Sequence, residues 1–221
     1  MATSIRYLPM LPLGTVLLPS AVLPVRLFED RYRRMITTVL AADRELGVVL
    51  IRRGSEVGGG DVRYDVGTRA RVLEAREDRE GCWAVTVVGL QRIRVERWMP
   101  DDPHPVAEVR PMPDLPGPDI SPSDYRSLET RLRRLLAGHS EMGDPDAEAT
   151  FDLPDDPGLG SLQMAALGPF TVYDRQRLLE AEFLMERYRL LDGLLREAQE
   201  ALDHRLGVGG ASDGPAAGSS R

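Results

Sequence analysis

The pattern of apolar and polar positions changes its period at about residue 113. Before that point, short apolar runs and alternating stretches are bounded by proline, glycine and charged turns, which is typical of strands. One amphipathic helix interrupts them over 29–42, where Tyr32, Met35, Ile36, Val39 and Leu40 share one face. The predicted strands are 5–13, 23–27, 45–51, 66–75, 83–90, 93–98 and 106–112.

The second half of the chain has helical periodicity. The proline cluster 111–118 is stiff and extended, so it marks a boundary. Ser121 with Asp124 and Thr171 with Asp174 have the spacing of helix N-caps. The predicted helices cover 121–137, 161–167 and about 171–205, and the acidic stretch 141–160 is interpreted as a loop.

These elements predict an α+β fold in which a small rolled sheet or barrel precedes helices. We expect a β-rich subdomain over 1–113 and a helical subdomain over 114–206. A Gly-, Ser- and Ala-rich tail, 207–221, is expected to be disordered.

The last predicted helix carries an apolar seam along its whole length. Its positions are Leu184, Tyr188, Leu191, Leu195, Ala198 and Leu202. Packing against the helix 121–137 explains most of the seam. The seam extends past a short helix pair, so a homodimer through this helix stays open.

Composition limits the setting in which the protein works. The formal net charge is −7, and 42% of the residues are hydrophobic, which is ordinary for a globular protein. No apolar run approaches the roughly 20 residues of a membrane helix. The first residues lack the pattern of a secretory signal, and Cys82 is the only cysteine, so a cytoplasmic location is expected.

The chain contains neither lysine nor asparagine, and both use adenine-rich codons, which favours a GC-rich bacterial source. Without lysine there is no P-loop, no Schiff base and no Ser-Lys dyad. His104, His139 and His204 stand far apart, without metal-ligand spacing. The sequence therefore predicts no catalytic residues, no metal site, no cofactor and no enzymatic activity.

Several motifs give the chain a family resemblance. Phe28-Glu-Asp-Arg-Tyr32 opens the first helix after proline-punctuated strands. Tyr64–Val72 contains Val-Gly-Thr-Arg-Ala, and 83–95 ends in Val-Val-Gly-Leu-Gln-Arg-Ile-Arg-Val. The strand 105–110, the stretch 175–181 and the pair Glu186-Arg187 follow. Together these resemble the amino-terminal, substrate-binding domain of Lon proteases.

The resemblance implies a PUA-like β pseudo-barrel followed by helices. It also implies a non-catalytic protein-recognition module, without the ATPase and peptidase of full-length Lon. The partner would be a polypeptide substrate or a protein. Apolar candidates for its contact surface, expected to line the junction of the two subdomains, are Leu17, Leu18, Phe28, Trp98 and Met99. For each of them, core packing is the alternative.

RNA binding is the alternative function, because many PUA-like domains bind RNA. Arginines on neighbouring predicted strands would form a basic strip. Against this, the net charge is −7 and only 5% of residues are aromatic, so stacking platforms are scarce. The strip consists of Arg69, Arg71, Arg92, Arg94 and Arg97.

Overall fold

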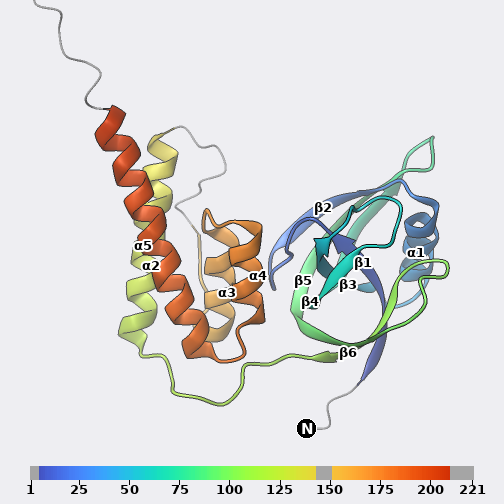
Figure 1. Cartoon of the computed structure of the whole chain (residues 1–221), viewed down its shortest axis with the longest axis horizontal. Coiled ribbons are helices and arrows are strands. Elements are labelled where there is room, and N and C mark those ends of the chain that lie inside the picture. The colour runs from blue at the N-terminus through green and yellow to red at the C-terminus, as the bar shows by residue number, and fades with distance from the viewer. Residues whose placement is uncertain (1–4, 143–150, 210–221) are drawn as a thin grey trace, which may run out of the picture.

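The computed structural model describes residues 5–142 and 151–209 and shows a β-barrel beside a group of helices (Figure 1). The α+β class predicted from the sequence is confirmed, with a long last helix. The barrel part contains β1 (Arg6–Leu13), β2 (Val22–Leu27), α1 (Asp30–Ala41), β3 (Glu45–Arg53), β4 (Val62–Glu77), β5 (Trp83–Trp98) and β6 (Val106–Pro111). The helical part contains α2 (Pro122–Glu141), α3 (Pro157–Leu167), α4 (Val172–Glu180) and α5 (Leu184–Gly209).

The sheet has six strands in the order β2-β5-β4-β3-β1-β6, and an added β5–β6 pairing closes it into a barrel. β1 and β3 are parallel, and the other pairs are antiparallel. β5 is one continuous strand where two were predicted. The first half of β5 pairs with β2. Its second half pairs with β6, and this second pairing closes the barrel.

Two glycines of the recognised motifs allow backbones to approach closely. A Cβ on Gly67 would lie 2.3 Å from the carbonyl oxygen of Val48 on β3. A Cβ on Gly89 would lie equally close to the carbonyl oxygen of Leu18. Only glycine fits at both places, which explains why the two strand motifs contain it.

The apolar face predicted for α1 packs against the interior of the barrel. Tyr32, Met35, Ile36 and Val39 are buried, and they pack with apolar residues of β1, β3, β4 and β5. Figure 1 shows α1 on the side of the barrel away from the other helices. The outer face of α1 is therefore free of the helical part.

The helical part packs on the barrel through a shared core. Leu191, Leu195 and Leu202 of α5 are buried with residues of α2, α3 and α4, and the same cluster includes Leu18 and Val66 of the barrel part. The apolar seam of the last helix is thus used inside the chain. A homodimer through this helix stays a prediction, as do the subdomain limits 1–113 and 114–206.

The single helix predicted over 171–205 is wrong, because α4 ends at Glu180 and α5 begins at Leu184. Arg92 of β5 donates hydrogen bonds to the carbonyls of Leu179 and Ala181, at 2.9 and 2.6 Å. These contacts satisfy terminal carbonyls of α4 from outside the helix. A partner this distant in sequence leaves no trace in helical periodicity.

Two further boundaries differ from the prediction. α3 begins at Pro157, inside the stretch interpreted as a loop, with Asp156 as its N-cap. α5 continues to Gly209, and the rest of the predicted disordered tail lies outside the described residues. The N-caps Ser121 and Thr171 are confirmed, since each side chain accepts a hydrogen bond from the backbone three residues on.

We predict that Leu191→Asp unfolds the helical part. Leu191 is fully buried, so the variant would place an unpaired charge in the core of α5. The expected loss is at least about 3 kcal/mol in the free energy of unfolding, measured by urea denaturation. Ala201→Asp, on the exposed side of the same helix, is the control. Equal midpoints for the two variants would contradict this packing.

Candidate functional site

The structure does not bring the five apolar candidates together. Leu17 and Leu18 are 3% and 1% exposed, so core packing is the role that the structure gives them. Phe28 is 55% exposed, directly after β2. Trp98 and Met99 are half-buried at the end of β5.

Trp98 lies at one end of the barrel and not at its junction with the helices. It packs against the cluster that contains Leu8 and Ile93. The Arg63 guanidinium lies over its indole ring, 4.6 Å from the ring centroid, and donates to Asp61 at 2.6 Å and Asp101 at 2.5 Å. Arg63 therefore links the Trp98 ring to Asp61 and Asp101 at that end of the barrel.

Phe28 lines a small hollow of about 30 Å³ beside the start of α1. Val57, 52% exposed in the β3–β4 loop, lines the same hollow. Two exposed apolar side chains from separate segments thus form one surface. The hollow is also lined by Leu11, Pro12, Leu13, Arg26, Leu27, Glu29, Tyr32 and Glu56.

The charged residues of the Phe28–Tyr32 motif hold the loop that carries Val57. Glu29 accepts a hydrogen bond from the backbone N–H of Gly58 at 3.2 Å. Arg31 donates to Glu29 and to the carbonyl of Glu56, both at 3.2 Å, and its guanidinium lies 4.5 Å from the centroid of the Tyr32 ring. The motif therefore sets the position of Val57 relative to Phe28.

Tyr32 connects the Phe28–Tyr32 motif to the barrel core. Its ring is buried in the barrel core, and burial raises the pKa of its hydroxyl to about 12. The phenol is therefore neutral at physiological pH. Gly58, Gly59 and Gly60 all have positive φ, so the loop that bears Val57 follows a path that glycine allows without strain.

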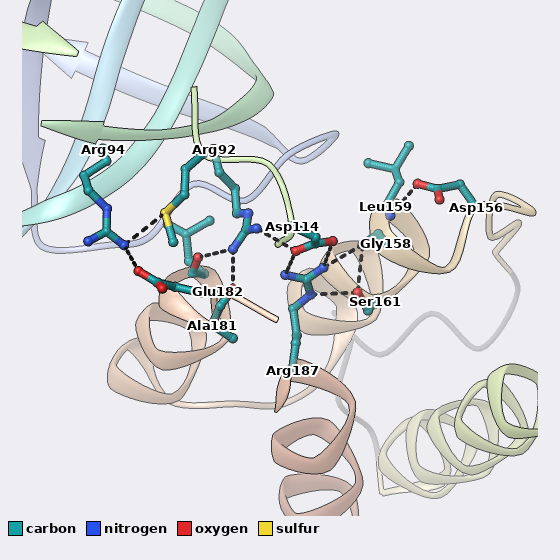
Figure 2. Close-up of polar contacts among 12 residues, drawn as sticks. Arg92, Arg94, Asp114, Asp156, Gly158, Leu159, Ser161, Ala181, Glu182 and Arg187 are labelled. Carbon is teal, nitrogen blue, oxygen red and sulfur yellow. Dashed lines mark hydrogen bonds and ion pairs between the residues drawn. The ribbon is translucent and has the colours of Figure 1, made fainter. Parts of the chain in front are cut away.

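The junction between the barrel and the helices is built on one carboxylate (Figure 2). Asp114 accepts hydrogen bonds from Arg187 at 2.8 and 2.6 Å and from Arg92 at 2.6 Å. Arg187 is fully buried and Arg92 is 4% exposed. Arg187 also donates to the Ser161 hydroxyl at 2.8 Å. We call Arg92, Asp114 and Arg187 the arginine clamp.

Further contacts surround the arginine clamp. Arg94 pairs with Glu182 at 2.5 Å, and the side-chain amide of Gln176 donates to the carbonyl of Val66 at 3.1 Å. Burial, together with the nearby positive charge of Arg187, lowers the pKa of Arg92 to about 10. Arg92 is therefore still charged at neutral pH, and Asp114 balances part of that charge.

Every arginine of the strip suggested for RNA binding forms an ion pair with an acid of the same chain. Arg69 and Arg71 both pair with the buried Glu45, at 2.8 and 2.9 Å. Arg97 pairs with Glu108 at 2.8 Å, and Arg92 and Arg94 bind Asp114 and Glu182. Each arginine of the strip has an acidic partner, which does not favour phosphate binding.

Sequence reasoning missed Asp114, because it lies in a proline cluster interpreted as a linker. Nothing in the local pattern distinguishes it from a solvated acid. Arg92 and Arg187 were found only as members of motifs, and their pairing through one carboxylate required the fold.

The described residues, 5–142 and 151–209, contain neither a metal-binding group nor a membrane-spanning helix. In those ranges, no group of three or more His, Cys, Asp or Glu side chains is placed to hold a metal ion. No helix described there is both long and apolar enough to cross a membrane.

Comparison with known families gives one match over most of the chain. The family model of the ATP-dependent protease La (LON) substrate-binding domain matches residues 7–197. Lon protease 2 of Herpetosiphon aurantiacus is 29% identical over 206 residues, and Lon protease 2 of Thermus thermophilus is 29% identical over 198 residues. These alignments cover 89% and 88% of this chain but only 24% of each relative.

Solved structures show the same fold. A Lon N-terminal domain protein from Xanthomonas campestris is 27% identical and superposes with a TM-score of 0.62. The N-terminal domain of a Mycobacterium avium complex Lon protease is 20% identical, with a TM-score of 0.64. Each comparison covers 86% of this chain and 98% of the other.

We predict that Asp114→Asn loosens the attachment of the helices to the barrel. The variant leaves two buried guanidinium groups without their shared negative charge. Removing one partner of a buried ion pair costs about 3–5 kcal/mol, and we expect a loss of that size in urea denaturation. Asp119→Asn, an exposed change in the same segment, is the control and should be silent. If both variants unfold like the parent, the clamp does not hold the junction.

Proposed function

The chain belongs to the ATP-dependent protease La (LON) substrate-binding domain family, and on that premise we propose that it is a protein-recognition module. It binds polypeptide segments or a protein partner in the cytoplasm and catalyses no reaction. The relatives named Lon protease are several times longer than the matched region, so their activity as whole proteins is not carried over to this chain.

The observation that carries the proposal is the surface formed by Phe28 and Val57. Both side chains are more than half exposed, and both line one hollow. Exposed apolar groups that share a surface are typical of protein contact sites.

The charge arrangement supports protein over RNA as the partner. The arginines of the strip are paired with acids, and the net charge of the chain is −7. Recognition therefore depends on apolar and backbone contacts. Such contacts are much less sensitive to salt than phosphate contacts, which release counterions.

We predict that Phe28→Ser weakens binding to an unfolded polypeptide. Reduced, carboxymethylated α-lactalbumin is a suitable probe, with affinity measured by fluorescence anisotropy. Burying a Phe side chain contributes about 1.5–3 kcal/mol, so we expect a loss of about tenfold or more. Tyr173→Ser is the matched control, because Tyr173 is an aromatic residue 63% exposed on α4.

The salt dependence of the affinity distinguishes polypeptide binding from RNA binding in the same assay. The affinity of the parent protein for the polypeptide should change little between 50 and 200 mM salt, roughly the range over which phosphate contacts weaken strongly. Tight, salt-sensitive binding of single-stranded RNA, with none of the polypeptide, would reverse the assignment. Equal losses for Phe28→Ser and Tyr173→Ser would reject the Phe28 surface but leave recognition in place.

A further inference from the structure

One strand of the barrel has an edge that is open over its last residues. β4 extends to Glu77, but its pairing with β3 ends at Arg71, opposite Glu45. Arg44 covers the next positions, because its carbonyl accepts from the Val72 N–H and its guanidinium donates to the carbonyls of Val72 and Leu73. Among the described residues, none pairs with this edge of β4 beyond Leu73.

The hydrogen-bond pattern of the hairpin identifies the groups on this edge. The N–H of Asp78 donates to the carbonyl of Cys82 at 2.9 Å, so these two residues form a bonded pair. Bonded and non-bonded pairs alternate along an antiparallel ladder. Glu77 opposite Trp83 and Ala75 opposite Val85 are therefore non-bonded pairs, and their own N–H and C=O groups point away from β5.

The other side of β5 gives the same result independently. The N–H of Gly89 donates to the carbonyl of Ala21, which makes that pair bonded. The alternation then directs the backbone groups of Val85 and Trp83 toward β2. Those groups are not available to β4, so two donors and two acceptors, at Ala75 and Glu77, lie on the open edge.

A hollow adjoins this edge. It has a volume of about 450 Å³ and is lined by Glu77 at the end of β4, by Trp83 of β5 and by residues on the outer face of α1. Figure 1 shows the β4–β5 hairpin extending past the barrel beside α1. The other lining residues are Asp30, Arg33, Arg34, Thr37, Thr38 and Trp83.

The open edge of β2 differs in one respect. There the alternation places Val22, Pro24 and Arg26 outward. Proline has no N–H to donate, and it is one of the residues that protect edge strands from pairing. No proline occurs between Leu73 and Glu77, so the edge of β4 keeps its donors.

We propose that an extended polypeptide segment adds to the open edge of β4 as a further strand, between Leu73 and Glu77 and over the hollow beside α1. This inference rests on the proposed recognition function and says how the polypeptide is held. Backbone groups at Ala75 and Glu77 would bind the backbone of the segment, while α1 lies against its side chains. Strand addition uses the main chain for affinity, so it accepts many sequences.

Amide hydrogen exchange followed by NMR tests this at single residues. The probe is reduced, carboxymethylated α-lactalbumin, added to saturation. We expect the amides of Ala75 and Glu77 to exchange about tenfold or more slowly in the complex. The amides of Glu74 and Arg76, bonded to β5, serve as internal controls and should be slow with and without the probe.

The outcomes are distinguishable from those of the proposed function. If the polypeptide binds but Ala75 and Glu77 are unchanged, strand addition is wrong and recognition stands. If the polypeptide does not bind, both proposals fall. If the protein alone sediments as a dimer in which these two amides are already protected, the occupant is a second copy of the chain and the proposal is overturned.

Variants of Glu77 supply a second test. Glu77→Pro removes the Glu77 N–H, which points away from β5, together with the charge, whereas Glu77→Gln loses the charge and keeps that N–H. We expect Glu77→Pro to bind the polypeptide about three- to tenfold more weakly, the size of one lost hydrogen bond, and Glu77→Gln to bind like the parent. Melting temperatures close to that of the parent show that the hairpin is intact. Equal affinity for both variants would reject a donor role for Glu77.

Discussion

The carboxylate of Asp114 is the point at which the barrel and the helical part are joined by charge, because it binds an arginine from each. Removing two guanidinium groups from water is costly, and a shared carboxylate with neutral hydrogen-bond acceptors offsets that cost. Arg187 also donates to the Ser161 hydroxyl and to the carbonyl of Gly158, and Arg92 donates to carbonyls at the end of α4. The arginine clamp thus joins a barrel strand, the linker and the last helix at one point.

This use of charge determines which surfaces are left for a partner. The five arginines of the strip each pair with an acid, and the face toward the helices is closed by a shared core. Figure 1 shows that α1 lies on the opposite side of the barrel. Phe28, Val57 and the open edge of β4 all lie around α1. The clamp and the candidate surfaces therefore occupy different sides of the barrel.

Local features of the fold were predictable from the sequence, and contacts between distant residues were not. Strands, N-caps and the buried face of α1 follow from periodicity and capping chemistry, which act over a few residues. The carbonyls at the end of α4 and the carboxylate of Asp114 both bind Arg92, which is distant in sequence from both. Of the candidate site, Phe28 was identified from its motif. Val57 was not, because its partner surface forms only when the β3–β4 loop folds against α1.

Recognition of many polypeptides requires contacts that do not depend on one side-chain pattern. Charge pairing is selective, and in this chain the arginines of the strip are already paired with acids of the same chain. An apolar surface accepts any apolar side chain, and an open strand edge accepts any backbone except at proline. The hollows beside the two features share no lining residue, so a segment paired with β4 and one resting on Phe28 need not compete. A chain that used both would gain affinity through linked weak contacts and still tolerate changes of sequence in each.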